Sequence, residues 1–297
     1  MEMIEIEAFV VIAQVGSFTR VAAVLHLSQP AVSRRIDLLE RELEAPLFER
    51  VHSGARLTEA GEEFLPHARQ VLAAVRDGTA AVHALESGEK GSITLALVGT
   101  LASTSLTERL RAFREAHPGI RLKLRTARSD EVSILVQQGE VTLGLRYFAD
   151  PSPAVISSLA QEEELIVVCA AHSRLAAGAV TEPMALAGVP WIGFPTSIGS
   201  SGEPFTRVLE RQLLKVGLDG SEFIAIDSLT AQKRLIEADF GIGMLPASSV
   251  EEELRLGTLH ALPIAALATT APVLAIHRRG GYLSPAAQRL LNVLTAT

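Results

Sequence analysis

The chain has 297 residues, of which 48% are hydrophobic and 21% charged, a composition typical of a globular protein with two or three domains. Its formal net charge of -7 by itself argues against a nucleic-acid binder, so any such contact must come from cations placed locally. The single cysteine, Cys169, excludes an intramolecular disulfide and a cluster of cysteine ligands. It lies in an apolar run, and we expect a buried structural thiol.

The N-terminus carries no targeting signal that we recognise. Glu2, Glu5 and Glu7 stand where a signal peptide would have a basic region, and no apolar run approaches the length of a membrane span. We therefore expect a cytoplasmic protein with no membrane partner.

The first elements are three helices. Residues 4–15 have the periodicity of an amphipathic helix, and Ser17 to Leu43 predicts two further helices joined by a tight turn, capped by Ser17 and Ser28. Side chains that suit DNA bases and phosphates gather on the outward face of the last helix, namely Gln29, Ser33, Arg34 and Arg35. We interpret this pair as a helix-turn-helix; the alternative is an ordinary helical hairpin whose polar face is merely solvated.

A short hairpin and a long helix follow. Pro46 to Thr58 has a turn at Ser53-Gly54 and is typical of a wing. From Thr58, a plausible cap, a helix is predicted to about Glu86, with a kink at Pro66. Its apolar residues are spaced as a heptad seam that favours dimerisation: Phe64, Ala68, Val71, Val75, Gly78, Val82 and Leu85. The alternative is a helix packed on its own domain.

Beyond a linker at residues 87–91, strands alternate with helices, which favours a parallel sheet with crossovers. The first block has predicted strands at 93–97, 120–124 and 141–145 and helices at 106–116 and 131–138. The second has strands at 165–170, 191–194, 223–226 and 241–245 and helices at 204–216 and 228–238. A late strand at 272–277 and a helix at 285–294 could return to the first block. We expect the acidic run Glu162-Glu163-Glu164 to be a solvated loop.

Three motifs carry a resemblance to a known family. With Leu38-Leu39-Glu40, Leu47-Phe48-Glu49-Arg50 and Leu57-Thr58-Glu59-Ala60-Gly61 in this order, the chain resembles the LysR-type transcriptional regulators. The resemblance implies an α plus α/β protein with a winged helix-turn-helix at 1–58, a linker and dimerisation helix with hinge at 59–90, and an effector-binding domain at 91–297. That domain would have two α/β lobes, as in periplasmic binding proteins, with lobe I at about 91–160 and 269–297 and lobe II at about 161–268.

The resemblance also implies site residues. Matched position by position, the DNA contacts would be Ser17, Thr19, Gln29, Pro30, Ser33, Arg34, Arg50 and Arg56. Many members have arginine at the position of Ser53, so we expect a weaker grip by this wing. Effector contacts would lie beyond the carboxyl ends of the strands, at Thr100, Leu101, Ser103, Arg128, Arg146, Tyr147, Phe194, Thr196 and Ser228. Their hydroxyls and cations suit a small carboxylate, although Arg128 and Arg146 have Asp130 and Asp150 as alternative partners.

We therefore expect a sequence-specific, DNA-binding transcription regulator whose activity a small-molecule effector modulates. Its partners would be double-stranded DNA, the effector, further copies of itself in a dimer or tetramer, and RNA polymerase. We expect no cofactor, no metal and no catalytic residues, because the eight histidines are scattered and no Gly-x-Ser-x-Gly motif occurs. The alternatives are a cytoplasmic small-molecule-binding or metabolic α/β protein whose N-terminal helices only mediate association, and, less strongly, an enzyme on the α/β domain.

Overall fold

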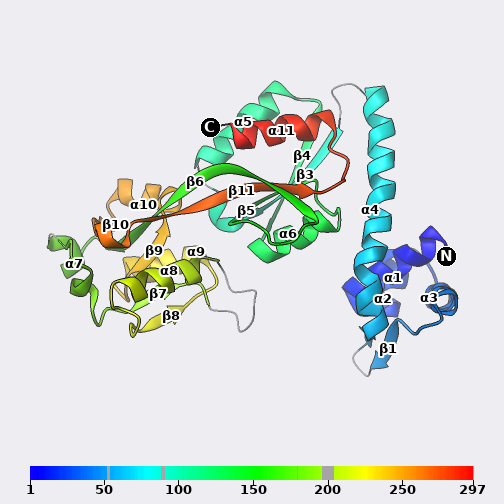
Figure 1. Ribbon diagram of the computed structural model, residues 1–297, viewed down its shortest axis with the longest axis horizontal. Coiled ribbons are helices and arrows are strands. Elements are labelled where there is room, and N and C mark those ends of the chain that lie inside the picture. The colour runs from blue at the N-terminus through cyan, green and yellow to red at the C-terminus, as the bar shows by residue number, and fades with distance from the viewer. Residues whose placement is uncertain (52–53, 88–90, 103, 179, 196–203, 297) are drawn as a thin grey trace. The chain divides into compact units, whose positions relative to one another are not determined.

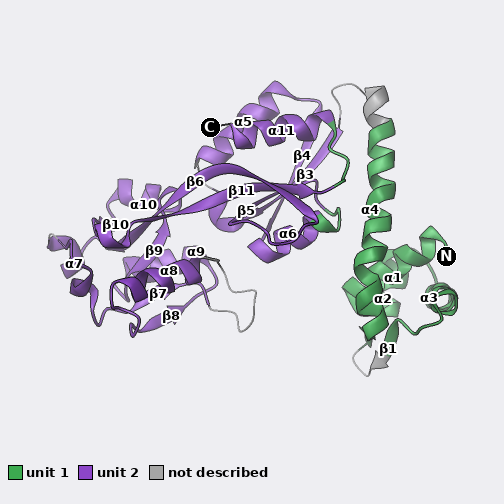
Figure 2. Ribbon diagram, viewed as in Figure 1, with its two compact units in different colours: residues 1–88, 137–140, 280–284 green, residues 89–136, 141–279, 285–297 purple. Residues whose placement is uncertain are grey.

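The computed structural model describes residues 1–296 except 52–53, 88–90, 103, 179 and 196–203; the side chains of 50–51, 83–87, 104 and 204 also lie outside the description. The chain forms two compact units (Figure 2). The first comprises residues 1–88 with the short segments 137–140 and 280–284, and the second comprises 89–136, 141–279 and 285–297. The long helix therefore belongs to the same unit as the N-terminal elements.

The first unit contains the three expected helices, the hairpin and the long helix (Figure 1). The elements are α1 (Met3–Val15), α2 (Phe18–Val24), α3 (Gln29–Leu43), β1 (Phe48–Val51), β2 (Gly54–Leu57) and α4 (Glu59–Ser87). Both predicted caps are confirmed: the hydroxyl of Ser17 accepts from the amide of Arg20 at 3.4 Å, and that of Ser28 accepts from Ala31 at 3.3 Å. These bonds satisfy amide groups that have no partner within a first helical turn.

Aromatic rings join the helices, the hairpin and the start of α4 in one core. The ring of Phe9 in α1 packs against Phe48 of β1 and Phe64 of α4, with centroids 5.3 and 5.2 Å apart. Around it lie the buried side chains of Ile12, Val21, Val32, Ile36, Leu39 and Leu47. Tilted ring pairs of this kind add to the stabilisation that comes from apolar burial.

The predicted heptad seam of α4 has two parts. Phe64 packs on the core of the first unit and Ala68 is fully buried in it. Farther along the helix, Val71, Val75 and Val82 are 41%, 47% and 59% exposed. The start of α4, with Phe64 and Ala68, therefore packs on its own domain, which was the alternative to a dimerisation seam. The later part of α4 leaves an apolar stripe uncovered within this unit.

A carboxylate fixes the hairpin to the second helix of the helix-turn-helix. Oε1 of Glu40 in α3 accepts from the backbone amides of Leu47, at 2.6 Å, and Phe48, at 3.2 Å. Thr58 holds the other end of the hairpin, because its hydroxyl donates to the carbonyl of Pro46. The same hydroxyl accepts from the amide of Gly61 and so caps α4 as predicted. The segment between α3 and α4 is thus held at both ends.

The second unit is built on a mixed sheet with strand order β10-β6-β11-β5-β3-β4, in which β9 also pairs with β6. Strands β3 (Gly91–Val98), β4 (Ile120–Ala127) and β5 (Leu143–Tyr147) are parallel as expected. Helices α5 (Thr104–Ala116) and α11 (Pro285–Thr295) cover one face, and α6 (Ser129–Gln137) covers the other (Figure 1). The late strand β11 (Thr269–Arg278) returns to pair with β5, which confirms that return.

The other lobe of this unit has a small parallel pair of its own, β7 (Trp191–Gly193) and β8 (Phe223–Ala225). Its core contains Val168, Ile192, Ile236, Leu245, Val250 and Leu259. The remaining elements are α7 (Arg174–Ala177), α8 (Pro204–Lys215), α9 (Leu229–Glu237), α10 (Glu251–Leu256), β9 (Gly243–Pro246), β10 (Leu259–Leu262) and the 3-10 turns η1 (Gly99–Leu101), η2 (Pro183–Leu186), η3 (Ala247–Ser249) and η4 (Ala265–Leu267).

One strand belongs to both lobes. β6 (Val155–Ala170) pairs antiparallel with β11 from Val155 to Leu165 and then with β9 and β10 up to Ala170. The sheet therefore adds these antiparallel pairs to the expected parallel strands β3, β4 and β5.

The solvated loop expected at residues 162–164 is wrong, because this acidic run lies inside β6. Glu163 is only 5% exposed, and its carboxylate accepts from the amide of Ser248, at 3.2 Å, and from the side chain of Gln161, at 3.1 Å. These two donors allow a charged group to be buried in the strand.

Cys169 has no exposed surface, which confirms the buried thiol.

None of the helices in the described part of the chain is both long and apolar enough to span a bilayer.

Replacing Glu40 with alanine should lower the free energy of unfolding of the first unit by about 1.5–3 kcal/mol, because the amides of Leu47 and Phe48 lose a charged acceptor. Urea denaturation followed by circular dichroism measures this change. Glu7→Ala, which alters an exposed carboxylate of α1, is the control and should change stability by less than about 0.5 kcal/mol. Equal effects of the two substitutions would contradict the assigned role of Glu40.

Cys169 should react slowly with thiol reagents in the native protein. Burial, helped by the charge of Asp239, raises the pKa of its thiol to about 11, so roughly one thousandth is thiolate at pH 8. We expect the rate with a disulfide reagent to rise by orders of magnitude in denaturant and, in the native protein, to increase with pH. Rapid reaction of the native protein at pH 7 would show that the thiol is accessible.

Candidate functional site

The first candidate site is the outward face of α3. Val32, Ile36 and Leu39 hold the inward face in the core. Exposed at the start of the helix are Gln29, Pro30 and Arg34, with Ser33 partly exposed. The structure thus brings together the four residues predicted to meet bases. Nε2 of Gln29 also lies 3.5 Å from the hydroxyl of Ser33, which favours a defined orientation of both side chains.

The two predicted backbone anchors lie at the start of α2. Thr19 is exposed, whereas the Ser17 hydroxyl serves as the helix cap and is partly buried. The nearby guanidinium of Arg20 donates to the carbonyl of Val15, at 2.6 Å, so this cation is held against the end of α1.

Two glycines fasten the hairpin to the turn between α1 and α2. The amide of Ala55 donates to the carbonyl of Gly16 at 2.9 Å, and a Cβ on Gly54 would lie only 2.2 Å from that same oxygen. Gly54 also has a φ of +138° and Gly16 a φ of +69°, which disfavour other residues. The wing is therefore positioned by backbone contact.

Of the two predicted wing contacts, Arg56 and Arg50, the structure describes the side chain of Arg56 only. Arg56 of β2 is exposed and lies opposite Glu49 of β1 in the ladder. Arg50 pairs through its backbone with Ala55, but its side chain lies outside the description, as does Ser53 altogether. Among the described wing side chains, the carboxylate of Glu49 thus lies opposite the cation of Arg56 and offsets part of its attraction for phosphates.

The second candidate site lies where the two lobes of the second unit present the carboxyl ends of their parallel strands. Val98 of β3 pairs with Ala127 of β4, so Thr100 and Arg128 follow these strand ends on neighbouring positions. In the other lobe, Phe194 follows β7 and Asp227 follows β8. One pocket of about 140 Å³ is lined by all four of these residues together with Val98, Gly99, Ala127, Phe205 and Leu229. Ligands bind at such strand ends in open α/β sheets.

Polar groups in this pocket are few. Thr100 is 6% exposed, and its hydroxyl has no hydrogen-bond partner among the described residues. The side chain of Arg128 is 63% exposed and forms an ion pair with Asp130 at 3.1 Å. Arg128 therefore lines the pocket and also has the alternative partner that the sequence suggested. Ser228 caps α9 by accepting from the amide of Ala231.

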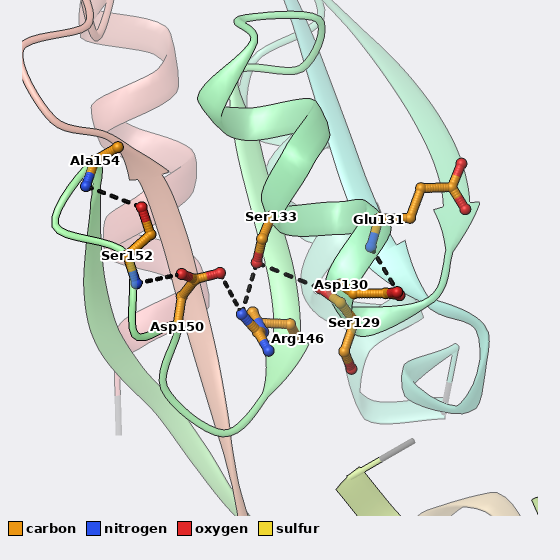
Figure 3. A network of polar contacts seen from close by, with 8 residues as sticks. All are labelled: Ser129, Asp130, Glu131, Ser133, Arg146, Asp150, Ser152 and Ala154. Atoms are coloured by element: carbon orange, nitrogen blue, oxygen red, sulfur yellow. Dashed lines mark hydrogen bonds and ion pairs between the residues drawn. The ribbon is translucent and has the colours of Figure 1, made fainter. Parts of the chain in front are cut away.

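Arg146 lies elsewhere, in a buried ion pair with Asp150 (Figure 3). Its guanidinium also donates to the hydroxyl of Ser133 at 2.6 Å. Asp150 in turn accepts from the amide of Ser152, so the arginine fixes the loop after β5. The structure therefore gives Arg146 an internal role in the fold and leaves it out of the pocket lining.

The remaining predicted effector residues divide into three groups. Tyr147 is fully buried and packs edge-on against Phe205, with centroids 4.3 Å apart, so it supports the pocket wall from behind. Leu101 is buried and lines a separate small cavity within lobe I. Ser103 and Thr196 lie outside the described residues.

Several pocket residues were not selected from the sequence. Asp227 and Leu229 flank Ser228 in the segment that was selected, and both line the pocket. Phe205 lies in the first turn of α8, where no local pattern distinguishes a pocket wall from an ordinary core position. Within the described part of the chain, no group of histidine, cysteine, aspartate and glutamate side chains is placed to hold a metal ion.

Comparisons with known proteins cover the whole chain. A family model described as "LysR substrate binding domain" matches residues 86–297, and one described as "Bacterial regulatory helix-turn-helix protein, lysR family" matches residues 4–62. The HTH-type transcriptional regulator CbbR of Rhodospirillum rubrum is 28% identical over 293 residues, covering 98% of this chain and 95% of that protein.

Two solved structures have the same fold along their length. The crystal structure of CbnR, a LysR family transcriptional regulator, gives a TM-score of 0.71 at 24% identity and covers 99% of this chain and 98% of that one. Vibrio fischeri DarR, solved in complex with DNA, gives a TM-score of 0.56 at 25% identity, with coverage of 100% and 99%.

Gly54→Ala should lower the stability of the first unit by about 1–3 kcal/mol, because the new Cβ meets the carbonyl of Gly16 and the hairpin must shift. Gly78→Ala in α4 is the matched control. A Cβ there meets nothing within 4 Å, so helix propensity should make it stabilising by about 0.5–1 kcal/mol. Thermal unfolding of both variants measures these changes. Shifts of the unfolding temperature in the same direction would contradict the role of Gly54 in positioning the hairpin.

Proposed function

Because the chain belongs to the LysR family of transcriptional regulators, we propose that α3 and the wing read a specific operator and that a small molecule in the pocket between the lobes controls the output. The alternative in which the N-terminal helices only mediate association is set aside, since residues 4–62 match the DNA-binding part of that family. The output would be recruitment or blocking of RNA polymerase in the cytoplasm.

The observation that carries the DNA-binding proposal is the outward face of α3. Gln29, Ser33 and Arg34 lie on the first two turns of a helix whose other face is anchored in the core. Amide, hydroxyl and guanidinium groups in this position match the donors and acceptors of the major groove. With few cations nearby, we expect binding to depend on salt only modestly.

Self-association follows from the uncovered stripe of α4. Val71, Val75 and Val82 are exposed at heptad spacing, and pairing two such helices buries them. A two-fold pair of recognition helices would then read a dyad-symmetric operator.

Control by an effector requires that it bind one arrangement of the protein more tightly than another. The pocket suits this because its lining comes from both lobes. A small carboxylate fits the guanidinium of Arg128 and the hydroxyl of Thr100, with the ring of Phe194 as an apolar wall.

The primary test is selection of bound fragments from random DNA by the purified full-length protein at moderate salt, with Arg34→Ala selected in parallel. Enrichment of a dyad-symmetric site by the natural protein alone is the expected result. Failure to enrich any sequence beyond the Arg34→Ala control, even at low salt, would refute the operator-reading proposal.

The two arginines of the DNA-binding unit should differ in their effects. Arg34→Ala should relax preference at one position of each half-site, at a cost of about 1–3 kcal/mol, because a base contact is lost. Arg56→Ala should lower the affinity for the operator and for unrelated DNA by the same factor and reduce the salt dependence of binding, because a phosphate contact is lost. Binding titrations on the selected operator and on single-base variants separate the two, and equal loss of specificity would contradict this division of roles.

A further inference from the structure

The pocket between the lobes presents opposite charges from opposite sides. Arg128 follows β4 in one lobe, and Asp227 follows β8 in the other. We infer that the effector is a small zwitterion of the amino-acid class, with its carboxylate toward Arg128 and Thr100 and its ammonium toward Asp227. This inference rests on the proposed function, since it names the ligand class of the same pocket.

Thr100 points to a ligand independently of the charges. Its side chain is more than nine-tenths buried, and its hydroxyl has no partner in the described structure. A buried hydroxyl without a hydrogen bond is costly, and a polar group of a ligand would remove that cost. Because Val98 and Ala127 pair, the residues that follow, Thr100 and Arg128, approach the ligand from the same lobe. A carboxylate accepts hydrogen bonds from both.

Asp227 selects for a cation on the opposite side. It precedes the cap of α9, where the amides of a first helical turn would otherwise favour an anion. The carboxylate of Asp227 on the pocket wall opposes that preference and repels a second negative charge. On the other side, the pairing of Arg128 with Asp130 already neutralises part of the positive charge. A phosphate ester therefore fits this pocket less well than a molecule with no net charge.

The rest of the lining indicates an apolar side chain on the ligand. The rings of Phe194 and Phe205, with centroids 6.4 Å apart, form one part of the wall, and Val98, Ala127 and Leu229 complete it. A pocket of about 140 Å³ limits the ligand to a small molecule. Aliphatic and small aromatic amino acids satisfy both conditions.

Binding from both lobes gives such a ligand a means of control. The carboxylate and the ammonium of an α-amino acid share one carbon and would meet partners that belong to different lobes, so its affinity depends on the angle between the lobes. A ligand that lacks one end loses this dependence, because it binds a single lobe. Differential affinity for two arrangements is the thermodynamic requirement for an effector.

The test is calorimetric titration of the full-length protein with L-valine, L-leucine, L-methionine and L-phenylalanine, each compared with the acid that lacks its amino group and the amine that lacks its carboxylate. We expect at least one amino acid to bind at least tenfold more tightly than its two analogues. Asp227→Asn should remove most of the higher affinity of the amino acid relative to the deaminated acid. Arg128→Gln should lower the affinities of the amino acid and of the deaminated acid together. Asp219→Asn, an exposed acid of the same lobe outside the pocket lining, is the matched control and should leave all affinities unchanged.

Three results would overturn the inference: a deaminated acid that binds as tightly as its parent, an Asp227→Asn variant with an unchanged preference, or no binding by any amino acid at millimolar concentration. Thermal unfolding of each variant confirms that it is folded. These results bear only on the ligand class, because selection of operator DNA tests the proposed regulator function without any ligand.

Discussion

The second unit depends on a single constraint, the sharing of strand β6 by both lobes. β6 pairs with β11 over its first part and with β9 and β10 over its last, so one hydrogen-bonded ladder runs from lobe to lobe. The register of this ladder shifts between Val273 and Leu274. Since each lobe is attached to the same strand, their two sets of parallel strand ends meet at one place. The pocket is a consequence of that pairing.

The helices of the first unit were predictable because their signals are local. Ser17 and Ser28 act within three residues of themselves, and the apolar period of α3 reports its buried face directly. Strand β6 was predicted only in its last part because residues 155–164 mix polar and apolar side chains without a continuous apolar run, which begins only at Leu165. Glu163 can lie buried in it because its carboxylate accepts hydrogen bonds from Gln161 and from the non-local partner Ser248. The sequence around residues 162–164 contains no trace of that partner.

Arg128 and Arg146 show the same limit at the candidate site. Arg128 follows β4 and Arg146 is the second-last residue of β5, and each has an aspartate within four residues along the chain. In the structure both pairs form, but one arginine is 63% exposed on the pocket wall and the other is 10% exposed beneath a loop. The difference arises from the neighbours in space, above all from Ser133 beside Arg146. Residue type and spacing predicted the partners correctly but could not distinguish a ligand contact from a loop anchor.

The core of the DNA-binding unit extends into the long helix, and this fixes where the chain can be cut and rejoined. Phe64 packs against Phe9, and Ala68 is fully buried in the same core, although both lie well past the wing. Leu72 also packs against this core, so a hybrid regulator that joins this DNA-binding unit to a foreign sensor domain has to carry α4 beyond Leu72. A junction placed at the end of the wing would open the core and unfold the graft, whereas one placed between Val75 and Val82 would keep every one of these core residues.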